Sequence, residues 1–144
     1  ERVVMKLDGR GKEAKIARFK RIALSAAKQC TTPWIPEIHP FMSVEKAAET
    51  ARASGLILLG ALSDDAGDLR EVIGRRRTAV PGKIAVIIGP EGDFTRDEVD
   101  IFTKAGAIPV SFGPLVLRVE TAALYALSVL SYEFAGMVGG ATSS

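Results

Sequence analysis

Apolar residues in the first third of the chain recur at the spacing of an α-helix. This pattern predicts a helix from about Lys12 to Cys30, which the Thr31-Thr32-Pro33 segment ends because proline cannot continue a helix. A short edge strand is predicted at Trp34–Ile38, and another strand at Glu1–Leu7. The expected core face of the helix comprises Ile16, Phe19, Ala23, Ala26, Ala27 and Cys30.

The rest of the chain repeats a unit of buried strand, loop and helix. The predicted strands are Leu56–Leu59, Lys83–Ile88 and Ala107–Phe112. Helices are predicted from Ser43 to Ser54, from about Asp68, from Thr95 to Ala105 and from Glu120 to about Ala135. Thr95 and Glu98 have the spacing of a capping box. This order predicts an α/β fold with a mostly parallel sheet flanked by helices.

Each predicted strand is followed by a loop that contains glycine. These loops hold Gly60, the segment Gly89–Gly92 and the segment Gly113–Arg118. Because the carboxyl ends of parallel strands lie at one edge of a sheet, we expect the three loops to form one pocket.

The composition limits the classes of protein to which the chain can belong. The 144 residues, 47% of them hydrophobic, are enough for one globular domain, and no apolar run is long enough to span a membrane. One cysteine and one histidine exclude an internal disulfide and make a metal site improbable. A cytoplasmic protein is expected. Residues 1–28 carry nine Lys or Arg against three Asp or Glu, a balance that suits either a nucleic-acid-facing segment or a solvated helix.

The first distinctive motif is Ile88-Gly89-Pro90-Glu91-Gly92-Asp93-Phe94. Its glycines let a backbone approach a ligand closely. It lacks the lysine of a phosphate-binding loop and the GxGxxG spacing, which argues against a phosphate cradle. The alternative is a tight turn between a strand and a helix.

The second motif is Phe112-Gly113-Pro114-Leu115-Val116-Leu117-Arg118-Val119-Glu120-Thr121-Ala122. Its three central aliphatic residues need a packing partner, and an adenine-sized apolar ligand is one candidate. Glu120 suits the beginning of the last helix, where the helix dipole favours a negative charge. The alternative is a structural ion pair between Arg118 and Glu120.

Together the two motifs resemble the 16S rRNA uridine-N3 methyltransferase family of the SPOUT superfamily, whose pattern is a GPEGG-like loop followed by LGxRILRxETA. The segments Ala26–Cys30 and Ile35–Ile38 extend the likeness to about residues 2–135. Three positions depart from the family pattern. Asp93 replaces the second glycine of the first loop, Leu115 replaces an arginine, and Thr32 replaces a basic residue.

The resemblance implies a SPOUT methyltransferase fold with a C-terminal trefoil knot, and a homodimer. It also implies that residues 1–136 are such a domain, incomplete at its N-terminus and without the PUA-like RNA-binding domain, and that residues 137–144 are a flexible tail. The implied cofactor is S-adenosylmethionine, and the implied partner is 16S ribosomal RNA or the small ribosomal subunit.

The resemblance and the motifs together nominate three groups of residues. Those expected to contact the cofactor are Leu59, Gly60, Ile88, Gly89, Pro90, Gly92, Phe112, Gly113, Leu115, Val116, Leu117 and Thr121. Those expected to contact RNA are Arg18, Arg21, Lys28 and Gln29. Arg118 is expected to stabilise the negative charge that develops on the base, and Glu120 or Glu91 to orient Arg118 or accept the proton. Two alternatives are a ribose 2′-O-methyltransferase and a non-catalytic RNA-binding module.

Overall fold

The computed structural model describes residues 9–63, 65–76 and 81–138, with the side chains of residues 135–138 left aside. The chain divides into two compact units, Glu1–Ser43 and Val44–Ser144. The predicted strand at Glu1–Leu7 lies outside the described residues.

The first unit consists of helix α1, Gly9–Gln29, and an extended segment that follows it. Thr31 has a positive φ of 53°, and the Thr32 amide donates to the carbonyl of Ala27 at 3.1 Å, so the chain turns sharply where α1 ends. The predicted strand at Trp34–Ile38 is wrong, because this segment pairs with no described strand. Prolines at positions 33, 36 and 40 remove backbone donors that a ladder would need.

The core face predicted for α1 is correct at one of its positions. Ala27 is buried, but Phe19 is 44% exposed. Cys30, expected to be buried on the helix, is exposed because α1 has already ended at Gln29.

The second unit is built on a parallel sheet with the strand order β2-β4-β1-β3, which confirms the predicted fold class. Its strands are β1 Leu56–Gly60, β2 Gly67–Asp68, β3 Ile84–Ile88 and β4 Ile108–Ser111. The central strand β1 pairs with β3 and β4, so that Leu58 lies between Val86 and Ile108. The sequence pattern missed β2, since two residues are too few to show a strand period.

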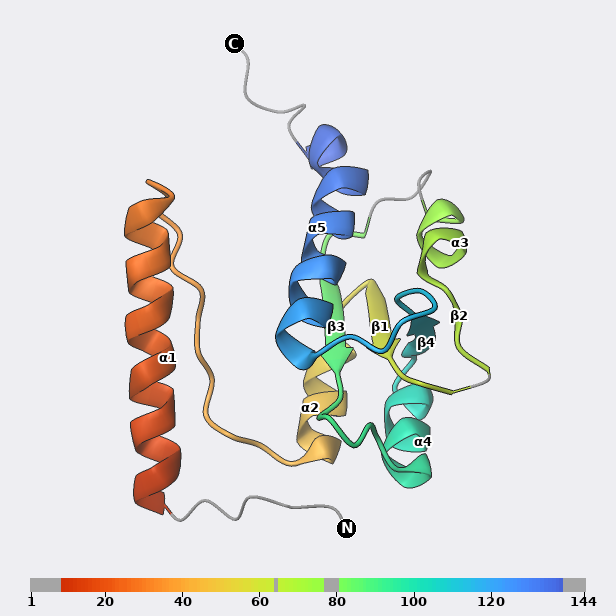
Figure 1. Ribbon diagram of the computed structural model, residues 1–144, viewed down its shortest axis with the longest axis horizontal. Coiled ribbons are helices and arrows are strands. Elements are labelled where there is room, and N and C mark those ends of the chain that lie inside the picture. Colours follow the sequence, from red (N-terminus) through yellow and green to blue (C-terminus); the bar gives the residue numbers. More distant parts are fainter. Residues whose placement is uncertain (1–8, 64, 77–80, 139–144) are drawn as a thin grey trace. The chain divides into compact units, whose positions relative to one another are not determined.

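Helices cover both faces of this sheet (Figure 1). On one face, α2 (Val44–Ala51) and α4 (Arg96–Lys104) pack against Ile57 and Leu59 of β1. On the other face, α3 (Leu69–Gly74) and α5 (Val119–Val138) pack against Leu56 and Leu58. Successive side chains of a strand point to opposite faces, so the apolar run of β1 supplies both cores.

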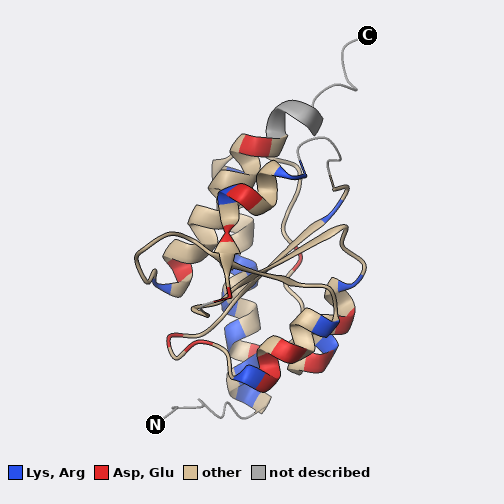
Figure 2. Ribbon diagram, turned by 90° about the vertical axis from the view of Figure 1, so that its right-hand side faces the viewer, with Lys and Arg blue, Asp and Glu red and all other residues tan. Residues whose placement is uncertain are grey.

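Charged residues lie around the sheet. Strands β1, β3 and β4 contain none, and Figure 2 shows the Lys, Arg, Asp and Glu residues on helices and loops. Within the described ranges, no helix has the length and apolar character needed to cross a membrane.

The N-terminus of α4 is capped as the sequence predicts. Thr95 and Glu98 form the predicted capping box, with the Thr95 amide donating to Glu98 Oε2 at 2.8 Å. Helix α4 ends before Gly106, whose φ of 98° glycine adopts without strain. The capping box fixes where α4 begins, at Arg96, four residues after the loop Gly89–Gly92.

Candidate functional site

One cavity lies at the carboxyl ends of β1, β3 and β4, within the second unit. Residues from all three of the expected loops line it. Its volume of about 270 Å³ has room for an organic ligand, since one water molecule occupies about 30 Å³ in the liquid. The cavity is therefore at the edge of the sheet where open α/β folds bind ligands.

The loop after β1 approaches its neighbours closely at Gly60. A Cβ atom there would lie 2.6 Å from Cε2 of Phe112, so a larger residue would displace the Phe112 ring, which also lines the cavity. The Ala61 amide donates to the carbonyl of Val110 at 3.3 Å, and the Leu62 amide donates to Oδ2 of Asp93 at 2.9 Å. This loop is thereby bonded to β4 and to the turn that follows β3.

The loop after β3 is a tight turn closed by the Asp93 amide, which donates to the carbonyl of Pro90 at 2.8 Å. Gly89 is buried, and a Cβ atom there would lie 3.0 Å from Cε2 of Phe94. Asp93 has a positive φ of 57°. The turn presents Pro90, Glu91 and Asp93 to the cavity.

The loop after β4 forms the apolar side of the cavity. Gly113 has a φ of 113°, and Ser111 Oγ both donates to its carbonyl at 3.1 Å and accepts from its amide at 3.3 Å. Leu115 and Val116 line the cavity and are each 74% exposed. Exposed aliphatic side chains at a cavity are suited to covering the flat face of an apolar ligand.

The charged side chains at this cavity are those of Arg118, Glu91 and Asp93. Arg118 is exposed, and among the described residues it forms no ion pair with Glu120 or Glu91. Its backbone carbonyl accepts from the Ala122 amide at 2.8 Å, so the helical turn of α5 fixes the position of its Cα. The Arg118–Glu120 ion pair considered above is therefore absent from this structure.

Eleven of the residues nominated for cofactor contact or catalysis line the cavity, and four do not. Those that line it are Gly60, Ile88, Gly89, Pro90, Glu91, Phe112, Gly113, Leu115, Val116, Leu117 and Arg118. Those that do not are Leu59, Gly92, Glu120 and Thr121.

The four nominated residues that do not line the cavity are kept from it for different physical reasons. Leu59 is fully buried in the core that β1 forms with α2 and α4. Gly92 is exposed within the turn. Because α5 advances about 100° per residue from Val119, Val119 and Ala122 lie on the cavity side while Glu120 and Thr121 turn away from it.

Seven lining residues were not nominated individually, namely Ala61, Leu62, Asp93, Val110, Ser111, Val119 and Ala122, although Ala61 and Leu62 lie in the first of the three loops expected to form the pocket. Ala61 and Leu62 follow the first glycine, and Asp93 was noted as a departure from the family pattern. A position within two residues of a loop glycine is the feature that indicates Ala61, Leu62 and Asp93.

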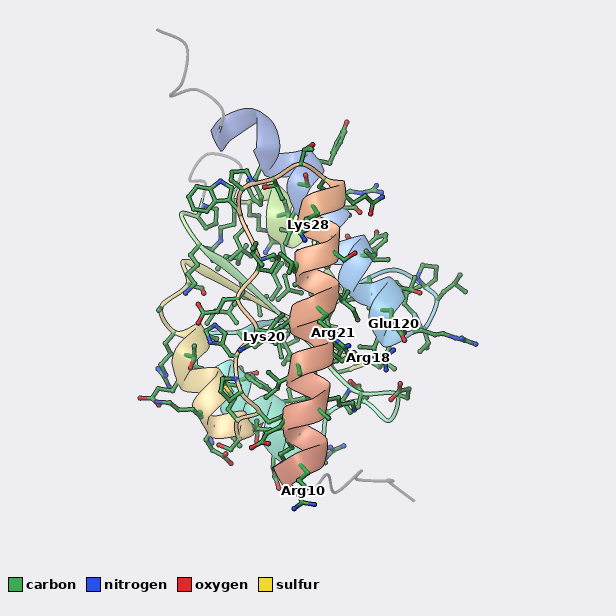
Figure 3. The ribbon with its side chains drawn as sticks, turned by 90° about the vertical axis from the view of Figure 1, so that its left-hand side faces the viewer. Arg10, Arg18, Lys20, Arg21, Lys28 and Glu120 are labelled. Carbon is green, nitrogen blue, oxygen red and sulfur yellow. The ribbon has the colours of Figure 1, made fainter. Side chains whose placement is uncertain are left out.

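The residues nominated for RNA contact lie in the first unit. Arg18, Arg21, Lys28 and Gln29 are exposed on α1. Figure 3 shows Arg10, Arg18, Lys20, Arg21 and Lys28 distributed along this helix. Helix α1 has no acidic residue in its first turn and has the basic Lys28 in its last turn.

Comparison with known proteins gives one family for most of the chain. A family model described as an RNA methyltransferase domain matches residues 1–131. The ribosomal RNA small subunit methyltransferase E of Mycobacterium tuberculosis is 32% identical over 133 residues, which cover 90% of this chain and 49% of the relative. The protein of the same name from Bacillus subtilis is 29% identical, covering 92% of this chain and 52% of the relative.

Solved structures show the same fold. A putative methyltransferase from Legionella pneumophila, in complex with S-adenosylmethionine, superposes with a TM-score of 0.78 at 33% identity over 92% of this chain and 52% of its own. A ribosomal RNA small subunit methyltransferase E from Neisseria gonorrhoeae, bound to S-adenosylmethionine, superposes with a TM-score of 0.76 at 29% identity. The match covers 91% of this chain and 52% of that protein. The chain thus spans about half the length of the proteins it matches.

Proposed function

The chain belongs to the RNA methyltransferase domain family, and from this we propose that it binds S-adenosylmethionine and methylates N3 of a uridine in 16S ribosomal RNA. The observation that carries the proposal is the cavity built by three loops at the carboxyl ends of β1, β3 and β4. Similar proteins of the same fold hold S-adenosylmethionine, which supports this choice of ligand.

The residues around the cavity fit this cofactor chemically. Leu115, Val116 and Leu117 offer aliphatic cover for an adenine ring, and the glycine-containing loops offer backbone donors and acceptors. Glu91 and Asp93 supply negative charge that favours a cationic ligand. When bound, S-adenosylmethionine supplies an electrophilic methyl group on a sulfonium.

The role that we propose for the chain's own side chains is to stabilise the negative charge that forms on the uracil base. Methylation at N3 of uracil replaces a proton, and loss of that proton leaves negative charge on the ring nitrogen and oxygens. Arg118, at the cavity and free of a carboxylate partner among the described residues, is the group that stabilises this charge. Glu91 is the carboxylate we assign to accept the proton or orient Arg118, since Glu120 does not line the cavity.

Substrate binding is assigned to α1. Arg18, Arg21 and Lys28 supply positive charge for phosphate contacts, and Gln29 supplies an amide. The target uridine must be unpaired or flipped out to present N3. The substrate implies a cytoplasmic location.

We also propose a homodimer in which α5 contributes an interface. Its inner side is buried at Ala122, Ala126, Leu130 and Phe134, but Leu124 and Leu127 are 67% and 60% exposed and Tyr132 is 86% exposed. Exposed apolar residues grouped on one helix are typical of an interaction surface.

A change of Leu127 to Asp is expected to shift the protein from dimer to monomer in light scattering at micromolar concentration, because a charge at an apolar interface loses its hydration. The control, Thr103→Asp, places the same charge on the exposed side of α4 instead of α5 and is expected to leave the dimer fraction unchanged. A wild-type protein that is monomeric in this measurement contradicts the interface.

The experiment that tests the function incubates the protein with unmodified 16S ribosomal RNA and S-adenosylmethionine carrying a labelled methyl group. Digestion of the RNA is expected to release labelled 3-methyluridine. Label on a ribose 2′-oxygen instead supports a ribose methyltransferase. Binding of RNA without any transfer supports a non-catalytic RNA-binding module.

A further inference from the structure

Asp93 connects two of the three loops that line the cavity. Its carboxylate Oδ2 accepts a hydrogen bond from the Leu62 amide at 2.9 Å, across 31 positions of sequence. We infer that Asp93 is a positioning residue that holds the loop after β1 in the shape that receives the cofactor. This inference rests on the proposed function, because the ligand it concerns is S-adenosylmethionine.

The backbone at Asp93 indicates that the side chain is needed there. Its φ of 57° lies in the left-handed region, which costs free energy for any residue with a Cβ atom. Glycine adopts this conformation without cost, and the family pattern has glycine at this position. Asp and Asn are the residues that tolerate it best after glycine. Aspartate at this position adopts a backbone conformation that is less favourable for it than for glycine, but its side chain supplies a hydrogen-bond acceptor that glycine lacks.

Among the described residues of the loop that Asp93 holds, Ala61 is the other one whose amide is bonded to a neighbouring element. The Ala61 amide is bonded to Val110 of β4 at 3.3 Å, and its side chain is buried. The next residue, Leu62, has a side chain that is 62% exposed, so packing restrains it weakly. Among the described residues, the bond to Asp93 is therefore the hydrogen bond that ties Leu62 to another loop.

The charge of Asp93 strengthens this restraint. A hydrogen bond from an amide to a carboxylate is stronger than one between neutral groups. Asp93 and Leu62 both line the cavity, so the bond fixes the cavity wall itself. A wall ordered before the ligand arrives spares the ligand the entropy cost of ordering it.

Three substitutions separate the acceptor, the charge and the backbone conformation. Asp93→Asn keeps an oxygen acceptor and tolerates a positive φ, but removes the charge. Asp93→Gly removes the acceptor and relieves the backbone. Asp93→Ala removes the acceptor and keeps the strain. Asp100→Asn, exposed on α4 and outside the cavity lining, is the control for the loss of a charge.

Calorimetric titration with S-adenosylmethionine is expected to show Kd raised about tenfold in Asp93→Gly, because ordering of the loop is added to the cost of binding. In Asp93→Asn, Kd is expected to stay within about threefold of the wild type, because the amide oxygen still accepts from Leu62. Asp93→Gly should keep a melting temperature close to that of the wild type, and Asp93→Ala should lower it. In methyl transfer, KM for S-adenosylmethionine should rise in Asp93→Gly with kcat changed much less.

A measurement without ligand tests the restraint directly. Hydrogen exchange of the Leu62 amide, followed by NMR in the free protein, should be faster in Asp93→Gly than in the wild type and unchanged in Asp100→Asn. Unchanged exchange in Asp93→Gly overturns the inference, as does a wild-type Kd in that variant. Equal losses of affinity in Asp93→Asn and Asp93→Gly would assign the effect to charge and overturn the hydrogen-bond role. If the wild type itself binds no S-adenosylmethionine, the proposed function fails and the positioning role fails with it, whatever the exchange result.

Discussion

Replacing Arg118 with alanine is expected to lower methyl transfer by about 100-fold or more, the effect of removing one donor that stabilises developing charge. Arg118 lines the cavity and its guanidinium has no ion-pair partner among the described residues, so it is available to the negative charge that the proposed reaction places on the uracil ring. The measurement is kcat/KM for transfer of a labelled methyl group to unmodified 16S ribosomal RNA.

The stability of this variant distinguishes a catalytic from a structural role. Because Arg118 is exposed, its loss should change the free energy of unfolding by less than about 0.5 kcal/mol. The affinity for S-adenosylmethionine should also change little, since in the proposed site the cofactor is held mainly by backbone groups of the loops. Arg96→Ala, an exposed arginine on α4 outside the cavity, is the matched control. A stable Arg118→Ala protein with undiminished turnover removes Arg118 from the mechanism.

Replacing Leu59 with alanine is expected to lower the free energy of unfolding by about 2–5 kcal/mol, the range for a truncated core leucine. Leu59 is fully buried on the central strand and packs in the core that contains Ala48 and Phe102. Removing three carbons there leaves a cavity that the sheet and helices cannot easily close. Urea denaturation measures the change.

The control for Leu59 is a leucine that does line the cavity. Leu115 is 74% exposed, so Leu115→Ala should alter stability by less than about 0.5 kcal/mol while weakening binding of S-adenosylmethionine. The two leucines thus separate core packing from ligand contact. A Leu59→Ala protein that keeps its stability but loses its affinity for S-adenosylmethionine would show that Leu59 belongs to the binding site and not to the core.

The arrangement of the second unit was predictable because its strands are short, continuous apolar runs that alternate with helical patterns. The runs at Leu56–Gly60, Ile84–Ile88 and Ile108–Ser111 are short and continuous, and a glycine-containing loop follows each of them. Parallel strands place such loops at one edge, so their convergence follows from the connection rule alone. The first unit was less predictable, because the prolines at 33, 36 and 40 overrode the apolar pattern of Trp34–Ile38.

The details of the site depended on contacts that no local pattern contains. Sequence reasoning placed Glu120 at the site because it follows Arg118 closely, but the phase of α5 turns it away from the cavity. Leu59 was assigned to the pocket as the residue before Gly60, although strand alternation directs it into the core. The bond between Asp93 and Leu62 joins residues from different strand ends, so it became visible only in the folded chain.

The most direct test of the central claim is a titration of the isotopically labelled protein with S-adenosylmethionine, followed by backbone-amide NMR. We expect saturable shifts concentrated in the three loops, at residues 60–62, 88–93 and 112–119, with the remainder of the sheet little affected. No saturable binding, or shifts confined to α1 with the three loops unchanged, would contradict the account.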